Sequence, residues 1–74
     1  MDSREESLKT EIYEVDPFTS RKDRLITTID SDYRFERQDE IFIEGAKPMK
    51  VRVVSVVVRL TGQEMERELL VMKL

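Results

Sequence analysis

The sequence predicts a small all-β domain, and three observations support this prediction. The first is a valine-rich run, Val51 to Leu60, which holds six valines in ten residues and lacks the spacing of an amphipathic helix. The second is the Thr61-Gly62 pair that follows it, which is typical of a hairpin turn. The third is that no helical pattern of useful length separates the predicted strands, which argues against a parallel sheet with crossover helices. We therefore expect a five-stranded antiparallel barrel of the SH3-like type, or a meander.

Shorter segments with the patterns of strands precede the valine run. The first alternates apolar and polar residues and ends at Asp16-Pro17, because proline cannot donate to a strand ladder. The second is rich in β-branched residues. Two further pieces, one of them only a short extended stretch, come before a connection that contains both Gly45 and Pro48. These segments are residues 8–15, 25–30, 33–40 and 41–43.

The valine run changes phase in its middle. Val51 and Val53 alternate with charged residues, whereas beyond Val54 the apolar positions move by one residue. A change of phase within one strand predicts a β-bulge or a sharp bend at Val53-Val54. It also places Val57 on the outer face, between Ser55 and Arg59, as a possible point of self-association.

The last segment, residues 63–74, leaves two structures open. Strong helix formers, with Met65, Leu69 and Met72 at helical spacing, favour a C-terminal helix and an α+β fold. Alternation of apolar residues near the C-terminus favours a strand instead. A strand would pair with the valine run, which otherwise has an open edge prone to aggregation. We therefore expect a strand.

Composition argues against several classes of function. The 74 residues include no cysteine and no histidine, which removes thiol chemistry, the commonest general base and the commonest zinc ligand. The Asp30-Ser31-Asp32 stretch lacks the glycine and the terminal glutamate of a calcium loop, so we interpret it as a turn. We expect no enzyme activity, no cofactor and no metal.

The sequence divides into a short tail and a single domain. Residues 1–7 are polar and acidic, which predicts a disordered tail rather than a secretory signal. Residues 8–74 form the single predicted domain. No apolar stretch is long enough to cross a bilayer as a helix, so we expect a cytoplasmic protein without membrane contact.

One stretch combines aromatic and basic residues and is our candidate for a binding surface. Aromatic rings beside arginine suit stacking on bases or cradling a peptide. Two basic residues of the long strand point outward together on the bent-strand hypothesis and could extend this surface. The structural alternative places Phe35 in the core and pairs the arginines with nearby acids. The candidate residues are Tyr33, Arg34, Phe35, Arg37, Lys50 and Arg52.

Our first functional hypothesis is a non-catalytic module that binds another protein, or a second copy of itself. The contact would use an exposed sheet edge or the Tyr33–Arg37 region. A nucleic-acid-binding barrel is one alternative, because residues 21–59 hold nine bases against seven acids, although the net charge of −3 disfavours it. A regulatory domain that senses a small ligand at a shallow surface site is the other.

Overall fold

A computed structural model describes residues 8–74, and the predicted tail, residues 1–7, lies outside this part. The described chain is a five-stranded sheet without helices, so it holds no helix that could cross a membrane. The predicted small all-β fold is confirmed, and residues 63–74 contain a strand rather than a helix. The strands are β1 (Leu8–Val15), β2 (Lys22–Ser31), β3 (Glu40–Ile43), β4 (Met49–Thr61) and β5 (Glu64–Lys73).

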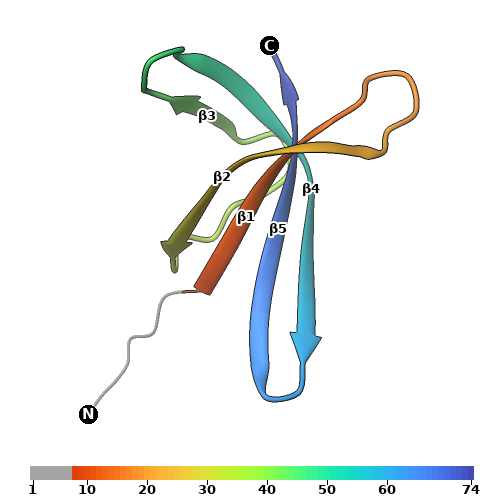
Figure 1. The fold of residues 1–74 in the computed structure, drawn as a ribbon, viewed down its shortest axis with the longest axis vertical. Helices are drawn as coiled ribbons and strands as arrows, with labels where there is room; N and C mark the ends of the chain where they lie inside the picture. Colours follow the sequence, from red (N-terminus) through yellow and green to blue (C-terminus); the bar gives the residue numbers. More distant parts are fainter. Residues whose placement is uncertain (1–7) are drawn as a thin grey trace.

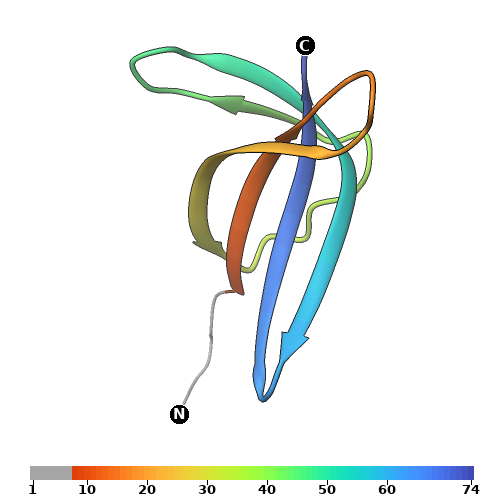
Figure 2. The ribbon, with the colours of Figure 1, turned by 45° about the vertical axis from the view of Figure 1, so that its right-hand side comes forward.

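The strands lie in the order β2-β1-β5-β4-β3 and curl into a half-barrel (Figure 1). Three neighbouring pairs are antiparallel hairpins, whereas β1 and β5 run parallel. The sheet is therefore mixed rather than wholly antiparallel. The parallel pair arises because residues 32–39 carry the chain from β2 at one edge of the sheet to β3 at the other (Figure 2). We call residues 32–39 the crossing segment; the stretch predicted as an extended piece forms most of it.

The hairpin between β4 and β5 forms as the sequence predicts, with its turn one residue later. Thr61 faces Glu64 across the ladder, so the turn residues are Gly62 and Gln63. Gly62 has a φ of 64°, a conformation that glycine adopts without steric cost. Glycine at the first of two turn residues is typical of a type II′ turn, whose twist matches that of paired strands.

The predicted bulge in β4 is confirmed. Val53 faces Val71 and Ser55 faces Leu70, which leaves Val54 without a partner on β5. A second bulge lies opposite Val53 on the other side of β4, just before β3 begins. Gln38, with a φ of 81°, donates to the Val53 carbonyl at 2.9 Å, and the Val53 N–H donates to the Asp39 carbonyl at 2.8 Å. Gln38 and Asp39 thus both lie opposite Val53, and the first of the two has a positive φ, as in a G1 bulge. β4 therefore bends at Val53.

The core lies on one face of the curled sheet, which we call the core face. Its buried residues come from β1, β4 and β5, and Phe35 of the crossing segment packs against them. Two register shifts in β2, opposite β1, add to the curl. The opposite side is called the outer face. The buried core residues are Ile12, Val51, Val53, Leu69 and Val71.

Matched threonine substitutions on the two faces of β4 test the change of phase. Val56 packs against the core, whereas Val57 lies on the outer face and is partly exposed. Threonine has nearly the shape of valine, so Val56→Thr mainly places a hydroxyl against apolar atoms. We expect Val56→Thr to lower the free energy of unfolding by about 1–2 kcal/mol, and Val57→Thr to change it by less than about 0.5 kcal/mol. Urea unfolding measures both, and equal losses would contradict the assigned phase.

Candidate functional site

The main candidate site is a cleft along the outer edge of β3, which we call the β3 cleft. It has a volume of about 410 Å³. Two of its aromatic rings are largely exposed: Tyr33 at 59% and Phe42 at 60%. Tyr33 also meets the half-buried Phe35 edge to face, with ring centroids 4.7 Å apart. The lining residues are Tyr33, Phe35, Asp39, Glu40, Ile41 and Phe42.

A tight turn sets the position of β3 against the crossing segment. The Asp39 N–H donates to the Glu36 carbonyl at 3.1 Å, and the Asp39 carboxylate accepts the Glu36 N–H at 2.9 Å. Asp39 therefore closes the turn through both its backbone and its side chain. Asp39 also lines the cleft, so these bonds fix one wall of the site.

Arg67 of β5 holds the aromatic side of the cleft in place. Its side chain donates to the Thr10 hydroxyl at 3.0 Å and to the backbone carbonyls of Tyr33 and Ser31 at 2.8 and 3.1 Å. The guanidinium also lies 5.2 Å from the centre of the Phe35 ring. Arg67 is only 6% exposed, and this burial lowers its pKa, an effect that the nearby Asp32 carboxylate opposes. Arg67 is thus a positioning residue for the crossing segment.

Lys50 and Arg52 point to the same side of β4, as the sequence predicts. Both contact the Glu40 carboxylate of β3 at 2.9 Å. The hydrogen bond from Arg52 and then that from Lys50 lower the pKa of Glu40. The two cations thus adjoin the β3 cleft through Glu40, and this carboxylate partly neutralises them.

The structure separates the remaining predicted residues into two groups. Tyr33 and Phe35 both line the cleft, whereas Arg34 and Arg37 do not. Both arginines are exposed and make no ion pair with any residue in 8–74. The predicted residues therefore form an aromatic wall and an adjacent charged pair on Glu40, not one continuous basic patch.

Sequence reasoning did not select Phe42 or Arg67. Phe42 carried a usable signal, because it lies between Ile41 and Ile43 and must point to the opposite face from them. Arg67 alternates in phase with Leu69 and Val71, so the sequence could also have predicted that it lies on the core face. Its hydrogen-bond partners could not be predicted, because they lie far away in the sequence.

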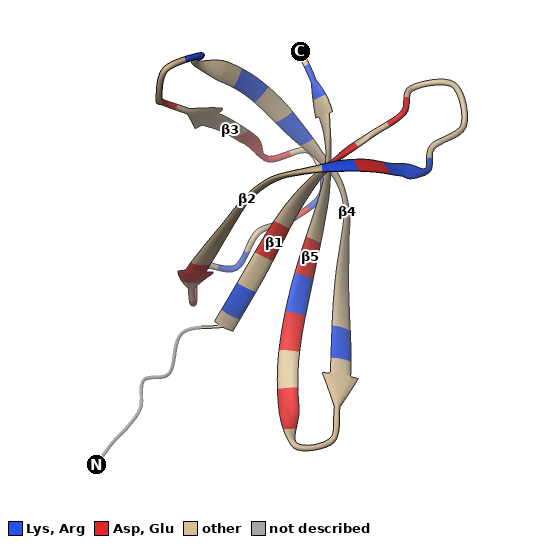
Figure 3. Ribbon diagram, in the orientation of Figure 1, with Lys and Arg blue, Asp and Glu red and all other residues tan. Residues whose placement is uncertain are grey.

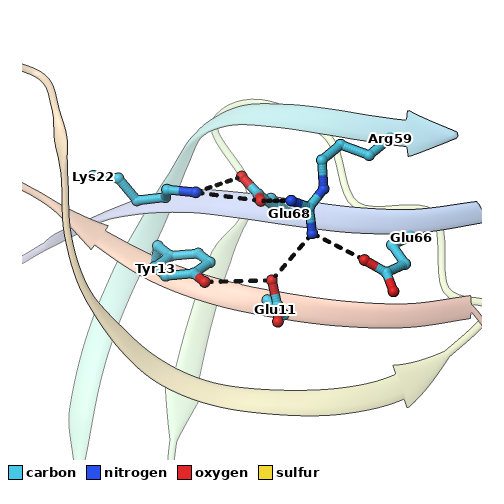
Figure 4. A network of polar contacts seen from close by, with 6 residues as sticks. All are labelled: Glu11, Tyr13, Lys22, Arg59, Glu66 and Glu68. Atoms are coloured by element: carbon cyan, nitrogen blue, oxygen red, sulfur yellow. Dashed lines mark hydrogen bonds and ion pairs between the residues drawn. The ribbon is translucent and has the colours of Figure 1, made fainter. Parts of the chain in front are cut away.

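A second polar cluster covers the outer face and links four strands (Figure 4). Glu68 of β5, only 6% exposed, contacts Lys22 of β2 and Arg59 of β4, each at 3.3 Å. Arg59 also contacts Glu66 at 2.9 Å and Glu11 of β1 at 3.5 Å. Arg59 of β4 thus pairs with two acidic residues of β5, its neighbour in the sheet.

This outer-face cluster has a structural role. Its cations and carboxylates satisfy one another, and the Lys22 ammonium also lies 4.4 Å from the centre of the Tyr13 ring. Residues 8–74 contain no group of acidic side chains arranged to hold a metal ion. Val57, on this same face, is partly exposed beside the cluster.

The β3 cleft therefore stands out for binding. It offers exposed aromatic faces, apolar side chains and a strand edge. Comparisons with protein-family models, curated proteins and solved structures found no match. The function is accordingly inferred from the geometry and charge of the cleft itself.

Replacement of Arg67 tests its role in holding the crossing segment. Arg67→Met removes a buried charged donor to Thr10, Ser31 and Tyr33. We expect it to lower the free energy of unfolding by about 2–4 kcal/mol and to speed amide exchange around Tyr33. Arg52→Met is the matched control at an exposed ion pair, with an expected change of less than about 1 kcal/mol. Chemical denaturation and NMR hydrogen exchange measure both effects, and equal behaviour of the two variants would contradict this role.

The lowered pKa of Glu40 predicts a specific pH dependence. Because its ion pairs favour the charged form, they stabilise the fold above the ordinary glutamate pKa, and this stabilisation is lost as the pH falls through the lowered value. We expect carbon-detected NMR to show Glu40 titrating below the ordinary glutamate value. Arg52→Met should raise this pKa. Titration of Glu40 at the ordinary value in the wild type would show that the ion pairs do not form in solution.

Proposed function

We propose that this protein is a non-catalytic interaction module, which adds an extended segment of a partner protein to the open edge of β3. The observation that carries the proposal is the combination of an outward-facing backbone N–H at Glu40 with the exposed rings of Tyr33 and Phe42. Strand addition uses backbone hydrogen bonds for affinity and neighbouring side-chain pockets for specificity. The β3 cleft supplies both elements.

The direction of the Glu40 N–H follows from the backbone. The Asp39 carbonyl accepts a hydrogen bond from Val53 and so points toward β4. In a trans peptide unit the next N–H points the opposite way, which directs the Glu40 N–H away from β4. β3 is the last strand of the sheet order, so no strand of the described chain pairs with this side.

An added strand would have two sets of neighbours in the cleft. Its side chains alternate between the faces of the sheet. One set would lie beside Ile41 and Phe35, which belong to the core face or pack against it. The other set would lie beside Phe42, whose ring is on the outer side. A partner segment with alternating apolar residues therefore fits this edge.

The charges near the cleft favour a polypeptide over a nucleic acid. Lys50 and Arg52 already contact Glu40, so their attraction for phosphate is reduced. Of the predicted basic residues, this leaves Arg34 and Arg37 as the two without an ion pair in residues 8–74. Nucleic-acid affinity depends on several cations that are available to neutralise phosphates. The sequence hypothesis of a nucleic-acid-binding barrel therefore gains no support from this arrangement.

A matched pair of substitutions at Glu40 tests strand addition. Glu40→Pro removes the outward N–H, whereas Glu40→Ala keeps it, and both lose the ion pairs with Lys50 and Arg52. A photo-crosslinking benzoylphenylalanine in place of Phe42 reports the partner in cells that naturally make the protein. We expect crosslinked partner protein with the Glu40→Ala background and its loss with Glu40→Pro. Equal crosslinking in both backgrounds, or none in the wild type, would refute the proposal.

A further inference from the structure

A second surface lies at the far end of the β4–β5 hairpin, which projects beyond the start of β1 in both views (Figures 1 and 2). Leu60 faces Met65 across this hairpin, and Val58 faces Arg67, so all three apolar side chains continue the core face. Within residues 8–74 no strand and no part of the crossing segment covers them, and Leu60 is 73% exposed. We call Val58, Leu60 and Met65 the arm face.

A cavity of about 640 Å³ adjoins the arm face and shares Met65 with it. Four of its lining residues are acidic and two are basic; the acids of β5 are visible as red bands in Figure 3. Glu66 pairs with Arg59, whereas Asp30, Asp32 and Glu64 make no ion pair within residues 8–74. We call this cavity the arm pocket. Its lining is Leu8, Lys9, Asp30, Asp32, Gln63, Glu64, Met65, Glu66 and Arg67.

The loop between β1 and β2 has the complementary character. Phe18 is 94% exposed, and the loop also holds Arg21, an exposed basic residue that makes no ion pair within residues 8–74. The loop is nevertheless well ordered by hydrogen bonds: the Asp16 carboxylate accepts the N–H groups of Phe18 and Thr19 at 2.7 and 3.1 Å. The Asp16 N–H also closes the loop on the Arg21 carbonyl at 2.9 Å. A preordered loop that presents an aromatic ring to solvent loses little entropy on binding.

We propose that the Phe18 loop of one molecule docks into the arm pocket of a second copy. The ring would cover apolar atoms of Met65 and Leu60, and Arg21 would approach the carboxylates of Asp30 and Asp32. Burial of an aromatic side chain is a large source of binding energy, and opposite charges favour the correct encounter. The loop between β1 and β2 and the tip of the β4–β5 hairpin lie at opposite ends of the molecule (Figures 1 and 2), so the contact is head to tail and does not close within one pair.

The same charges disfavour two other occupants. An arm-to-arm dimer would bring two acidic pockets together. Residues 1–7 hold three acids and one base, so they are a poor match for an acidic pocket.

The head-to-tail contact leaves the β3 cleft open, and it is therefore independent of the proposed strand addition.

Sedimentation velocity tests this proposal with the full chain and two complementary variants. The protein concentration is raised to about 1 mM, where a contact with a Kd of about 1 mM becomes visible. Phe18→Ser removes the loop anchor, and the double variant Leu60→Ser, Met65→Ser removes the apolar part of the pocket. We expect the wild type to form larger species as the concentration rises and each variant alone to stay monomeric. An equimolar mixture of the two variants should form a dimer and nothing larger, because one supplies an intact pocket and the other an intact loop. The Leu74→Ser control changes an exposed leucine outside both surfaces and should assemble like the wild type.

Three results would overturn the head-to-tail contact. These are a wild type that stays monomeric throughout, association that persists in either variant alone, and an equimolar mixture that remains monomeric. The Asp30→Asn, Asp32→Asn variant should weaken assembly several-fold, and unchanged assembly would refute the electrostatic basis of the contact. None of these measurements depends on Glu40 or Phe42, so failure here and failure of strand addition at β3 can be told apart.

Discussion

The bend of β4 at Val53-Val54 determines the architecture of this domain. A regular strand alternates its side chains, so one uninterrupted register could not place Val51, Val53 and Val56 on the same face. The unpaired Val54 resets the alternation, and the bulge at Gln38-Asp39 bends the strand from the other side. The first half of β4 lies between β3 and β5, whereas the second half pairs with β5 alone. The same bend therefore produces both the covered core and the uncovered arm.

Two adjacent charged residues of β5 tie the half-barrel together from its two sides. Arg67 and Glu68 are both 6% exposed but point to opposite faces. Arg67 satisfies its donors with a hydroxyl and two backbone carbonyls, which fastens the crossing segment over the core. Glu68 instead lies between two cations from β2 and β4. A small domain buries a limited apolar area, so such polar ties matter for keeping its segments in place.

Local pattern was sufficient to predict much of the fold. The bounds of β1 followed from alternation and the Asp16-Pro17 break, and the bulge in β4 followed from alternation, because both depend on neighbouring residues. The C-terminal strand was harder to predict, since residues 63–74 fit both the helical spacing and the alternation of a strand. The need of the valine run for a pairing partner decided in favour of the strand. The parallel pairing of β1 with β5 was not predictable, because it joins segments from opposite ends of the chain. Residues 33–40 were expected to be extended, and the role of residues 33–39 in the crossing segment depends on the same long-range topology.

The binding surfaces also combine features that the local sequence predicts with features that depend on long-range pairing. Tyr33 and Phe35 could be selected from composition, but the contact of Lys50 and Arg52 with Glu40 depends on the register between β3 and β4. The arm pocket combines residues of β1, β2 and β5, so no local pattern reveals it. Phe18 follows the Asp16-Pro17 break in the sequence, and no local pattern selected it. Its exposure follows from the way in which Asp16 closes that loop.

The most direct test of this account is the register between β4 and β5 in solution. Cross-strand nuclear Overhauser effects between backbone protons report which residues face each other in an antiparallel pair. We predict contacts that place Val53 opposite Val71 and Ser55 opposite Leu70, with Val54 unmatched. Contacts that instead place Val54 opposite Leu70 in an unbroken ladder would contradict this prediction, because the bend, the covered core and the exposed arm would then lose their common cause.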